Sequence, residues 1–219
     1  YCVHQFEVEA YRAVGVDVMP LPDDIRGNIA RVRNYVKAEA EKDPGPFVML
    51  DDDIKAFTYW NGNKRHHLVG EQALEHIEGM ADLAMSWGVS LWGVNPAIDK
   101  GSYREHTPFS TICYCSASFH GFNNCRFQYD ERIPLKEDYD ICLQVLNAER
   151  VVLRFNAYGL DKDDHQNRGG CADYRTMQVE REQMELLQRK WGKRIVKEDA
   201  SSKQSFDINP VVKVPINGV

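Results

Sequence analysis

The segment PFVMLDDDIKAF, residues 46–57, constrains the fold more than any other part of the sequence. Its apolar run FVML predicts a short strand in the core of an α/β sheet. The run ends directly at Asp51, Asp52 and Asp53. Ligands bind where strands of such sheets end, and carboxylates are placed together to bind a cation. We therefore expect a divalent ion and a diphosphate here, although a solvated, Asp-rich turn explains the same residues.

Hydrophobic periodicity predicts that helices and strands alternate along the chain. The expected strands cover residues 1–3, 16–22, 47–50, 89–96, 110–122, 150–159 and 210–215, and the expected helices cover residues 7–14, 24–42, 70–88, 139–146 and 172–191. The alternation indicates an α/β fold with a mixed, mostly parallel sheet flanked by helices. The strand over 110–122 is the one that we expect to be antiparallel.

Composition limits the class of protein. A chain of 219 residues fits one domain. Its net charge of −6 gives no global attraction to nucleic acid, so such a contact needs a local basic patch. The six cysteines include no CxxC pair, and we expect reduced thiols. No apolar run approaches the roughly 20 residues that span a bilayer. These features predict a soluble, cytoplasmic protein, in the host cytoplasm if the source is viral, with no membrane partner.

Two acidic motifs in a fixed order suggest a fold family. RVRNYVKAEAEKDPGPFVMLDDDI resembles the GT-A nucleotide-sugar glycosyltransferases, in which an Arg-Asn helix precedes a strand carrying a DxD motif. IPLKEDYDICLQVL is similar to the acidic pair that opens a helix in the same fold. The likeness implies a Rossmann-like GT-A domain over 1–219, with a donor-binding half over about 1–95, an acceptor and catalytic half over about 96–195, and a tail over 196–219.

A closer likeness is to the glycosyltransferases associated with TET/JBP dioxygenases. EVEAYRAVGVDVMPLP, GNIARVRNYV, VMLDDDI, SLWGVNP, ASFHGF and LKEDYDICLQVL resemble that family's pattern over nearly the whole chain. The resemblance implies transfer of a sugar from a UDP-sugar to 5-hydroxymethylpyrimidine in DNA. GT-A enzymes begin with a strand that helps to hold the uracil. Nothing before Tyr1 supplies it, so we expect the first strand to be missing from this chain.

The resemblance also implies a metal site. We expect Asp53 to coordinate Mn²⁺ or Mg²⁺ directly, and Asp51 to bind the donor ribose or to reach the ion through water. His165 lies in the polar segment LDKDDHQNRGG and is the candidate third ligand, because many GT-A enzymes present a late histidine to the metal. A solvated loop histidine is the alternative.

A general base is expected at the start of the helix that follows IPLK. Asp138 is the first candidate and Glu137 the near alternative, because an acceptor hydroxyl loses its proton as it attacks the anomeric carbon. Inversion at the anomeric carbon follows from this assignment. The same acids also favour a helix N-terminus by compensating the helix dipole.

Further residues are donor-binding candidates, and each has a plainer explanation. Arg33 and Asn34 otherwise form a polar helix face, Trp92 otherwise packs in the core, and the segment from Arg168 otherwise just ends a loop. His120 and Gly121 lie where donor and acceptor walls are expected. The donor-binding set is Arg33, Asn34, Asp51, Asp52, Trp92, Asn95, Gly121, Arg168, Gly169 and Gly170.

The segment NGNKRHH is the local basic cluster and follows Tyr59 and Trp60. We expect a loop in which Lys64, Arg65, His66 and His67 contact DNA beside stacking aromatic rings. Solvated loop cations are the alternative. Three other functions remain open: a GT-A enzyme with a glycan, lipid or protein acceptor, a catalytically silent nucleotide-binding domain, and a nucleotidyltransferase that uses two metals.

Overall fold

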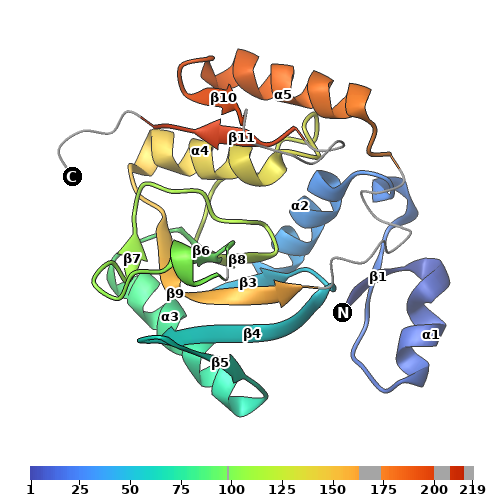
Figure 1. Cartoon of the computed structure of the whole chain (residues 1–219). Coiled ribbons are helices and arrows are strands. Elements are labelled where there is room, and N and C mark those ends of the chain that lie inside the picture. The colour runs from blue at the N-terminus through green and yellow to red at the C-terminus, as the bar shows by residue number, and fades with distance from the viewer. Residues whose placement is uncertain (98, 163–173, 200–207, 215–219) are drawn as a thin grey trace.

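The computed structural model describes residues 1–97, 99–162, 174–199 and 208–214. The strands of its main sheet are β3 (Phe47–Leu50), β4 (Ile54–Asn61), β5 (Lys64–Leu68), β6 (Leu91–Asn95), β7 (Phe109–Ser110), β8 (Phe119–Phe122) and β9 (Leu153–Lys162). They follow the order β3-β8-β6-β9-β4-β5, and β7 pairs with β9 beside this path (Figure 1). The α/β class is as expected.

The direction of the strands corrects the expectation of a mostly parallel sheet. Within the described part of the main sheet only β6 and β9 pair in parallel, and the other ladders are antiparallel. β8 runs antiparallel between β3 and β6, as expected for part of residues 110–122. The difference arises because the sheet also contains β4 and β5, which were not expected as strands and return antiparallel beside β9. Since two reversals cancel, β3, β6 and β9 point the same way. Their carboxyl ends therefore meet at one edge, where β3 passes into β4.

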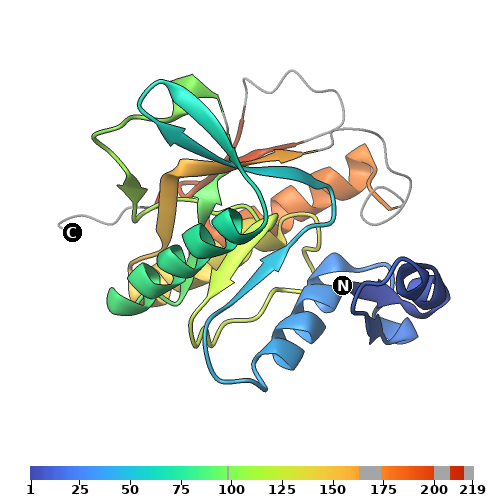
Figure 2. The same ribbon diagram turned by 90° about the horizontal axis from the view of Figure 1, so that it is seen from below.

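Helices cover both faces of this sheet. They are α2 (Ile29–Ala40), α3 (Glu71–Ser86), α4 (Glu137–Glu149) and α5 (Met177–Trp191). α3 lies on one face, α4 on the other, and α5 packs outside α4 (Figures 1 and 2). One core cluster joins α2 and α4 to the sheet, a second lies under α3, and a third lies between α4 and α5. Strand β6 is buried along its whole length because both of its faces are covered.

Two small units lie outside the main sheet. β1 (Cys2–His4), α1 (Val8–Ala13) and β2 (Met19–Leu21) form a unit in which the two strands pair in parallel, apart from the main sheet (Figure 1). Near the other end, β10 (Val196–Glu198) pairs antiparallel with β11 (Pro210–Val212). Short 3-10 helices cover Gln5–Glu7, Asp23–Ile25 and Lys100–Ser102. Among the helices in the described ranges, none has the length and apolar character that a bilayer span requires.

Most expected elements begin or end at other residues in the structure, and three of the differences have a clear physical cause. The helix expected over 24–42 begins only at Ile29, because Gly27 has a φ of +79° and Asn28 caps the helix by accepting a bond from the Arg31 amide at 3.1 Å. The expected strand over 110–122 is two short strands, since β7 pairs with β9 whereas β8 pairs with β3 and β6. The segment between them has to cross from one to the other.

The third difference concerns the basic cluster. Lys64, Arg65, His66 and His67 are not a loop but most of strand β5, which forms a hairpin with β4. Its two-residue turn is Gly62-Asn63, and Gly62 adopts a φ of +58°. A Gly-Asn pair between two strands is typical of a hairpin turn, so the sequence does contain a local signal for this hairpin.

Candidate active site

The three aspartates form the turn between β3 and β4, at the edge where strands β3, β6 and β9 end. The Asp51 amide donates to the Ser118 carbonyl at 3.3 Å, and Asp51 Oδ1 accepts a bond from Arg33 Nη2 at 2.8 Å. Burial opposes the charge on Asp51, but the Arg33 guanidinium outweighs it and holds the pKa of this carboxyl below its usual value. Asp51 is therefore an ionised carboxylate fixed by a cation from α2.

Arg33 joins the two acidic groups that the sequence singled out. Its side chain is 9% exposed, and its Nε lies 3.3 Å from Glu137 Oε1 on α4. Its Nη1 donates to the Ala117 carbonyl at 3.1 Å, just before β8. A buried guanidinium thus links the end of β3, the approach to β8 and the first turn of α4. It brings together Asp51 and Glu137, which are far apart in the sequence.

Glu137 is the first residue of α4, and the residue before it anchors this end of the helix to α5. Lys136, the residue before α4, is buried and its Nζ donates to Glu180 Oε2 on α5 at 2.6 Å. Glu137 itself is only 6% exposed. Burial and the charge of neighbouring Asp138 raise the pKa of Glu137 to about 8 despite the nearby guanidinium. Glu137 is consequently a buried carboxyl with a reduced tendency to ionise.

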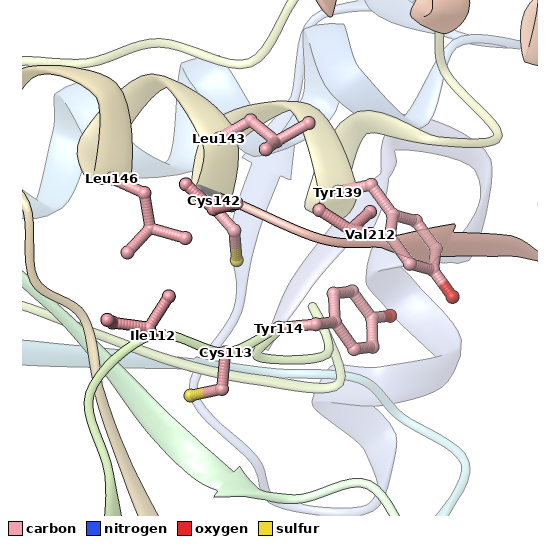
Figure 3. A pocket seen from close by; sticks show the side chains of 9 residues that line it. Ile112, Cys113, Tyr114, Tyr139, Cys142, Leu143, Leu146 and Val212 are labelled. Carbon is pink, nitrogen blue, oxygen red and sulfur yellow. The ribbon is translucent and has the colours of Figure 1, made fainter. Parts of the chain in front are cut away.

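Asp138 is half-buried and is oriented by two tyrosines. The Tyr114 hydroxyl donates to Asp138 Oδ2, and the Tyr139 amide donates to Asp138 Oδ1 at 2.8 Å. The rings of Tyr114 and Tyr139 stack with centroids 4.1 Å apart and line one end of a cavity of about 30 Å³ (Figure 3). Burial and the adjacent Asp138 raise the pKa of Tyr114, so this phenol stays protonated and acts as the hydrogen-bond donor. Asp138 is the carboxylate of the pair with a defined acceptor geometry.

Asp52 and Asp53 differ in their surroundings. Asp52 is exposed, as the alternative of a solvated turn requires. Asp53 Oδ1 is buried and has no hydrogen-bond partner among the described residues. Burial raises the pKa of Asp53, the charge of Lys162 opposes this, and the other two aspartates add to it. An orphaned carboxylate oxygen of this kind fits one bond to a cation.

The described residues do not complete a metal site. Among them, no three His, Cys, Asp or Glu side chains form a group that could hold a metal ion. The predicted ligand His165 lies outside the described residues, as do the predicted donor contacts Arg168, Gly169 and Gly170. Asp53 is thus the side chain whose geometry fits an ion, and Asp51 is already paired with Arg33.

Several predicted donor contacts lie in the core. Trp92 is fully buried, and a Cβ added to Gly121 would lie 2.0 Å from its ring, so the glycine makes room for the indole. His120 is buried between the Tyr129 hydroxyl at 2.7 Å and the Cys115 carbonyl at 2.9 Å. The structure therefore gives these residues packing contacts and does not bring their side chains to the acids.

Two predicted asparagines make structural hydrogen bonds. Asn34 Nδ2 donates to the Tyr129 carbonyl at 2.9 Å, and Asn34 Oδ1 accepts a bond from the Tyr129 amide at 2.8 Å. The two bonds tie the loop around Tyr129 to α2. Asn95 is buried; its amide nitrogen lies 3.3 Å from the Asn156 carbonyl and its oxygen accepts from the Ala97 amide at 3.2 Å. Their predicted contact with a donor stays a prediction.

The basic residues lie on β5 of the β4–β5 hairpin, where successive side chains point to opposite faces of the strand. Lys64 and His67 are exposed, and Arg65 pairs with Asp161 of β9 at 3.4 Å. Lys100 lies 5.3 Å from the Trp60 ring, which adds a cation to the same hairpin. The contact of Lys64, Arg65, His66 and His67 with DNA is a prediction that this arrangement leaves open.

Sequence reasoning missed three residues of the site. Tyr114 and Ser118 lie in the irregular segment between β7 and β8, where a continuous strand was expected. Lys162 ends β9, and its Nζ donates to Ser118 Oγ. The usable signal was the position of Lys162 three residues after the end of an expected strand, because strand ends converge on ligands in α/β sheets.

Comparison with known proteins bears on this site. A family model described as TET-Associated Glycosyltransferase matches residues 1–170 of the chain. The match includes both acidic groups, Arg33 and the β4–β5 hairpin. No curated protein and no solved structure matches the chain.

Proposed function

Because the chain belongs to the TET-associated glycosyltransferase family and is therefore a glycosyltransferase, we propose that it uses a UDP-sugar and a divalent metal ion. We further propose that the acceptor is the hydroxyl of a 5-hydroxymethylpyrimidine in DNA, and that the anomeric carbon is inverted. A TET-associated family suits such an acceptor, since its name connects it to enzymes that hydroxylate pyrimidines.

The bridge made by Arg33 is the observation that supports this proposal most directly. A GT-A-type enzyme needs the acids that hold the donor diphosphate close to the acid that activates the acceptor. Arg33 contacts Asp51 at 2.8 Å and Glu137 at 3.3 Å, so the turn after β3 and the first turn of α4 share one buried cation. Asp138, the next residue of α4, thereby lies at the same edge of the sheet.

Asp138 is the proposed general base. The acceptor hydroxyl oxygen attacks the anomeric carbon, its proton passes to a carboxylate oxygen of Asp138, and the bond from that carbon to the diphosphate oxygen breaks. UDP leaves with the electron pair, and a single displacement inverts the anomeric centre. The geometry favours Asp138 over Glu137, because Glu137 is buried against Arg33 whereas Asp138 is half-buried and held by Tyr114.

Asp53 is the proposed direct ligand of the ion. Asp51 is proposed to bind the donor ribose or to reach the ion through a water molecule. The orphaned Oδ1 of Asp53 supports this assignment. A bound Mn²⁺ or Mg²⁺ would offset the charge that develops on the diphosphate as UDP leaves. His165 as a further ligand, and Arg168, Gly169 and Gly170 at the diphosphate, remain part of the proposal without support from the described residues.

The β4–β5 hairpin is the proposed contact with the DNA backbone. A net charge of −6 requires a local basic surface for such a contact. Lys64, Arg65, His66 and His67 follow one another along the hairpin, and Lys100 lies over Trp60. This supports a backbone contact beside an aromatic ring.

A direct assay tests the proposal. The protein is incubated with Mn²⁺, a panel of UDP-sugars and duplex DNA containing 5-hydroxymethylcytosine or 5-hydroxymethyluracil, and the digested nucleosides are analysed by mass spectrometry. We expect one glycosylated nucleoside, formed only with metal. Asp53→Ala should abolish turnover and leave the fold intact, because a turn carboxylate contributes little packing.

The outcomes separate the alternatives. Transfer of sugar to a glycan, lipid or protein but not to DNA would retain the enzyme and reject the acceptor. Failure to bind UDP with Mn²⁺, seen as an unchanged melting temperature, would reject the donor and favour a silent domain. Near-normal turnover by Asp53→Ala would reject its role as metal ligand.

A further inference from the structure

Lys162 occupies the same edge of the sheet as the aspartates but is explained by none of the roles assigned so far. It is the last residue of β9 and lies opposite Ile54, the first residue of β4. Its Nζ donates to Ser118 Oγ, and the carbonyl of the same serine accepts the bond from the Asp51 amide at 3.3 Å. Ser118 therefore sets the position of Lys162 relative to the turn.

Lys162 lies beside the aspartate turn, because its partner across the ladder is Ile54, the residue that directly follows Asp53. Neither aspartate contacts the lysine as closely as Asp51 contacts Arg33. The ammonium is directly bound to a neutral hydroxyl, which leaves its charge to act over the turn.

The two cations of the site are placed differently. Arg33 is buried, and its guanidinium is directed to Asp51, Glu137 and the Ala117 carbonyl. Lys162 is half-buried at the end of β9. Arg33 thus holds the protein groups together, whereas Lys162 can meet a ligand that enters beside the aspartates.

We propose that Lys162 binds the diphosphate of the sugar donor. This inference rests on the proposed function and assigns the donor's anionic part to a specific residue. A lysine binds phosphate oxygens as a point charge on a flexible stem. A diphosphate next to three aspartates meets like charge, and Lys162 offsets part of that repulsion from within the protein. The lysine would move from Ser118 Oγ to a phosphate oxygen when the donor binds.

Calorimetric titration of UDP in the presence of Mn²⁺ tests the assignment. Lys162→Met should weaken UDP binding by about 10- to 100-fold, the range expected for loss of one hydrogen bond to a charged group. Binding of uridine, which carries no phosphate, should be unchanged. Lys162→Arg should stay within a few-fold of the wild type. Lys193→Met removes an exposed lysine from the loop after α5 and should leave UDP binding unaltered.

The result can contradict the inference in two ways. Equal UDP affinity for the wild type and Lys162→Met would show that the lysine does not meet the phosphates. An equal loss of UDP and uridine binding would show that it only maintains the site. Absence of UDP binding by the wild type would instead reject the proposed donor, so the two failures are distinguishable. Circular dichroism and the melting temperature establish that each variant is folded.

Discussion

The two carboxylates that share Arg33 respond to it in opposite ways. Asp51 accepts a 2.8 Å hydrogen bond from the guanidinium and has a lowered pKa. Glu137 lies 3.3 Å from Arg33 Nε, which makes no hydrogen bond within the described part of the chain, and the pKa of Glu137 is raised to about 8. The exposed side-chain fractions, 27% for Asp51 and 8% for Glu137, explain the difference. One cation fully compensates one carboxylate, and the more deeply buried one stays close to neutral.

This contrast separates the roles of the residues at the start of α4. A carboxyl that is buried against the Arg33 guanidinium has little access to a substrate hydroxyl. Its neighbour Asp138 has another environment, because the Tyr114 hydroxyl orients it and no arginine among the described residues forms an ion pair with it. The comparison therefore assigns structure to Glu137 and chemistry to Asp138, and each assignment can be broken by substitution.

Removal of the base should have the largest effect. Asp138→Asn keeps the shape of the side chain and removes its basicity, so we expect kcat to fall by about 10²- to 10⁴-fold. UDP affinity should stay unchanged. Glu137→Gln is the matched control and should lose far less activity, because the amide keeps the packing. A larger loss in Glu137→Gln than in Asp138→Asn would exchange the two roles.

Loss of the shared cation should destabilise the protein strongly. Arg33→Met leaves Asp51 and Glu137 without their partner, and breaking a buried pair costs about 3–5 kcal/mol of unfolding free energy. Denaturant unfolding followed by circular dichroism measures this. Arg31→Met is the control, since Arg31 lies on the same helix with its side chain 43% exposed and should change stability by no more than about 1 kcal/mol. Similar losses in both variants would show that Arg33 is not the central link.

The sequence predicted both acidic groups because each lies beside a strong local signal. The apolar run before Asp51 predicted a strand, and the LKED segment predicted the start of a helix. It also indicated Arg33, but as a contact for the nucleotide. The buried bridge could not be predicted, because it depends on how α2 packs against two strand ends, and hydrophobic periodicity contains no information on such distant contacts.

Tyr114 and Lys162 illustrate the same limit in another way. Tyr114 lies in a segment with strand-like composition that in fact crosses between two strands, so its direction could not be predicted from an alternating pattern. Lys162 depends on the sheet order, which places β9 and β3 with their carboxyl ends at one edge. The position of β8 between β3 and β6 could not be predicted from the sequence. Ser118, the residue directly before β8, makes the contact with Lys162.

The tyrosine that orients the base should have a moderate effect. Tyr114→Phe removes the hydroxyl that donates to Asp138 and keeps the ring that stacks on Tyr139. We expect kcat to fall about tenfold, the size of one such hydrogen bond, with KM for the donor unchanged. Tyr35→Phe on α2 is the control and should keep the wild-type kcat, and an unchanged kcat in Tyr114→Phe would contradict the positioning role.

The dependence of stability on pH tests the pKa contrast itself. Because burial raises the pKa of Glu137 to about 8 from its ordinary 4.5, the folded state keeps a proton that the unfolded chain releases. Its contribution to stability is complete below the ordinary value and is lost as pH rises through about 8. Urea unfolding at about pH 5 and about pH 9 should therefore show a smaller pH-dependent loss in Glu137→Gln than in the wild type. An identical loss in both would mean that Glu137 is ionised in the folded protein, as Asp51 is, and that Arg33 compensates both carboxylates equally.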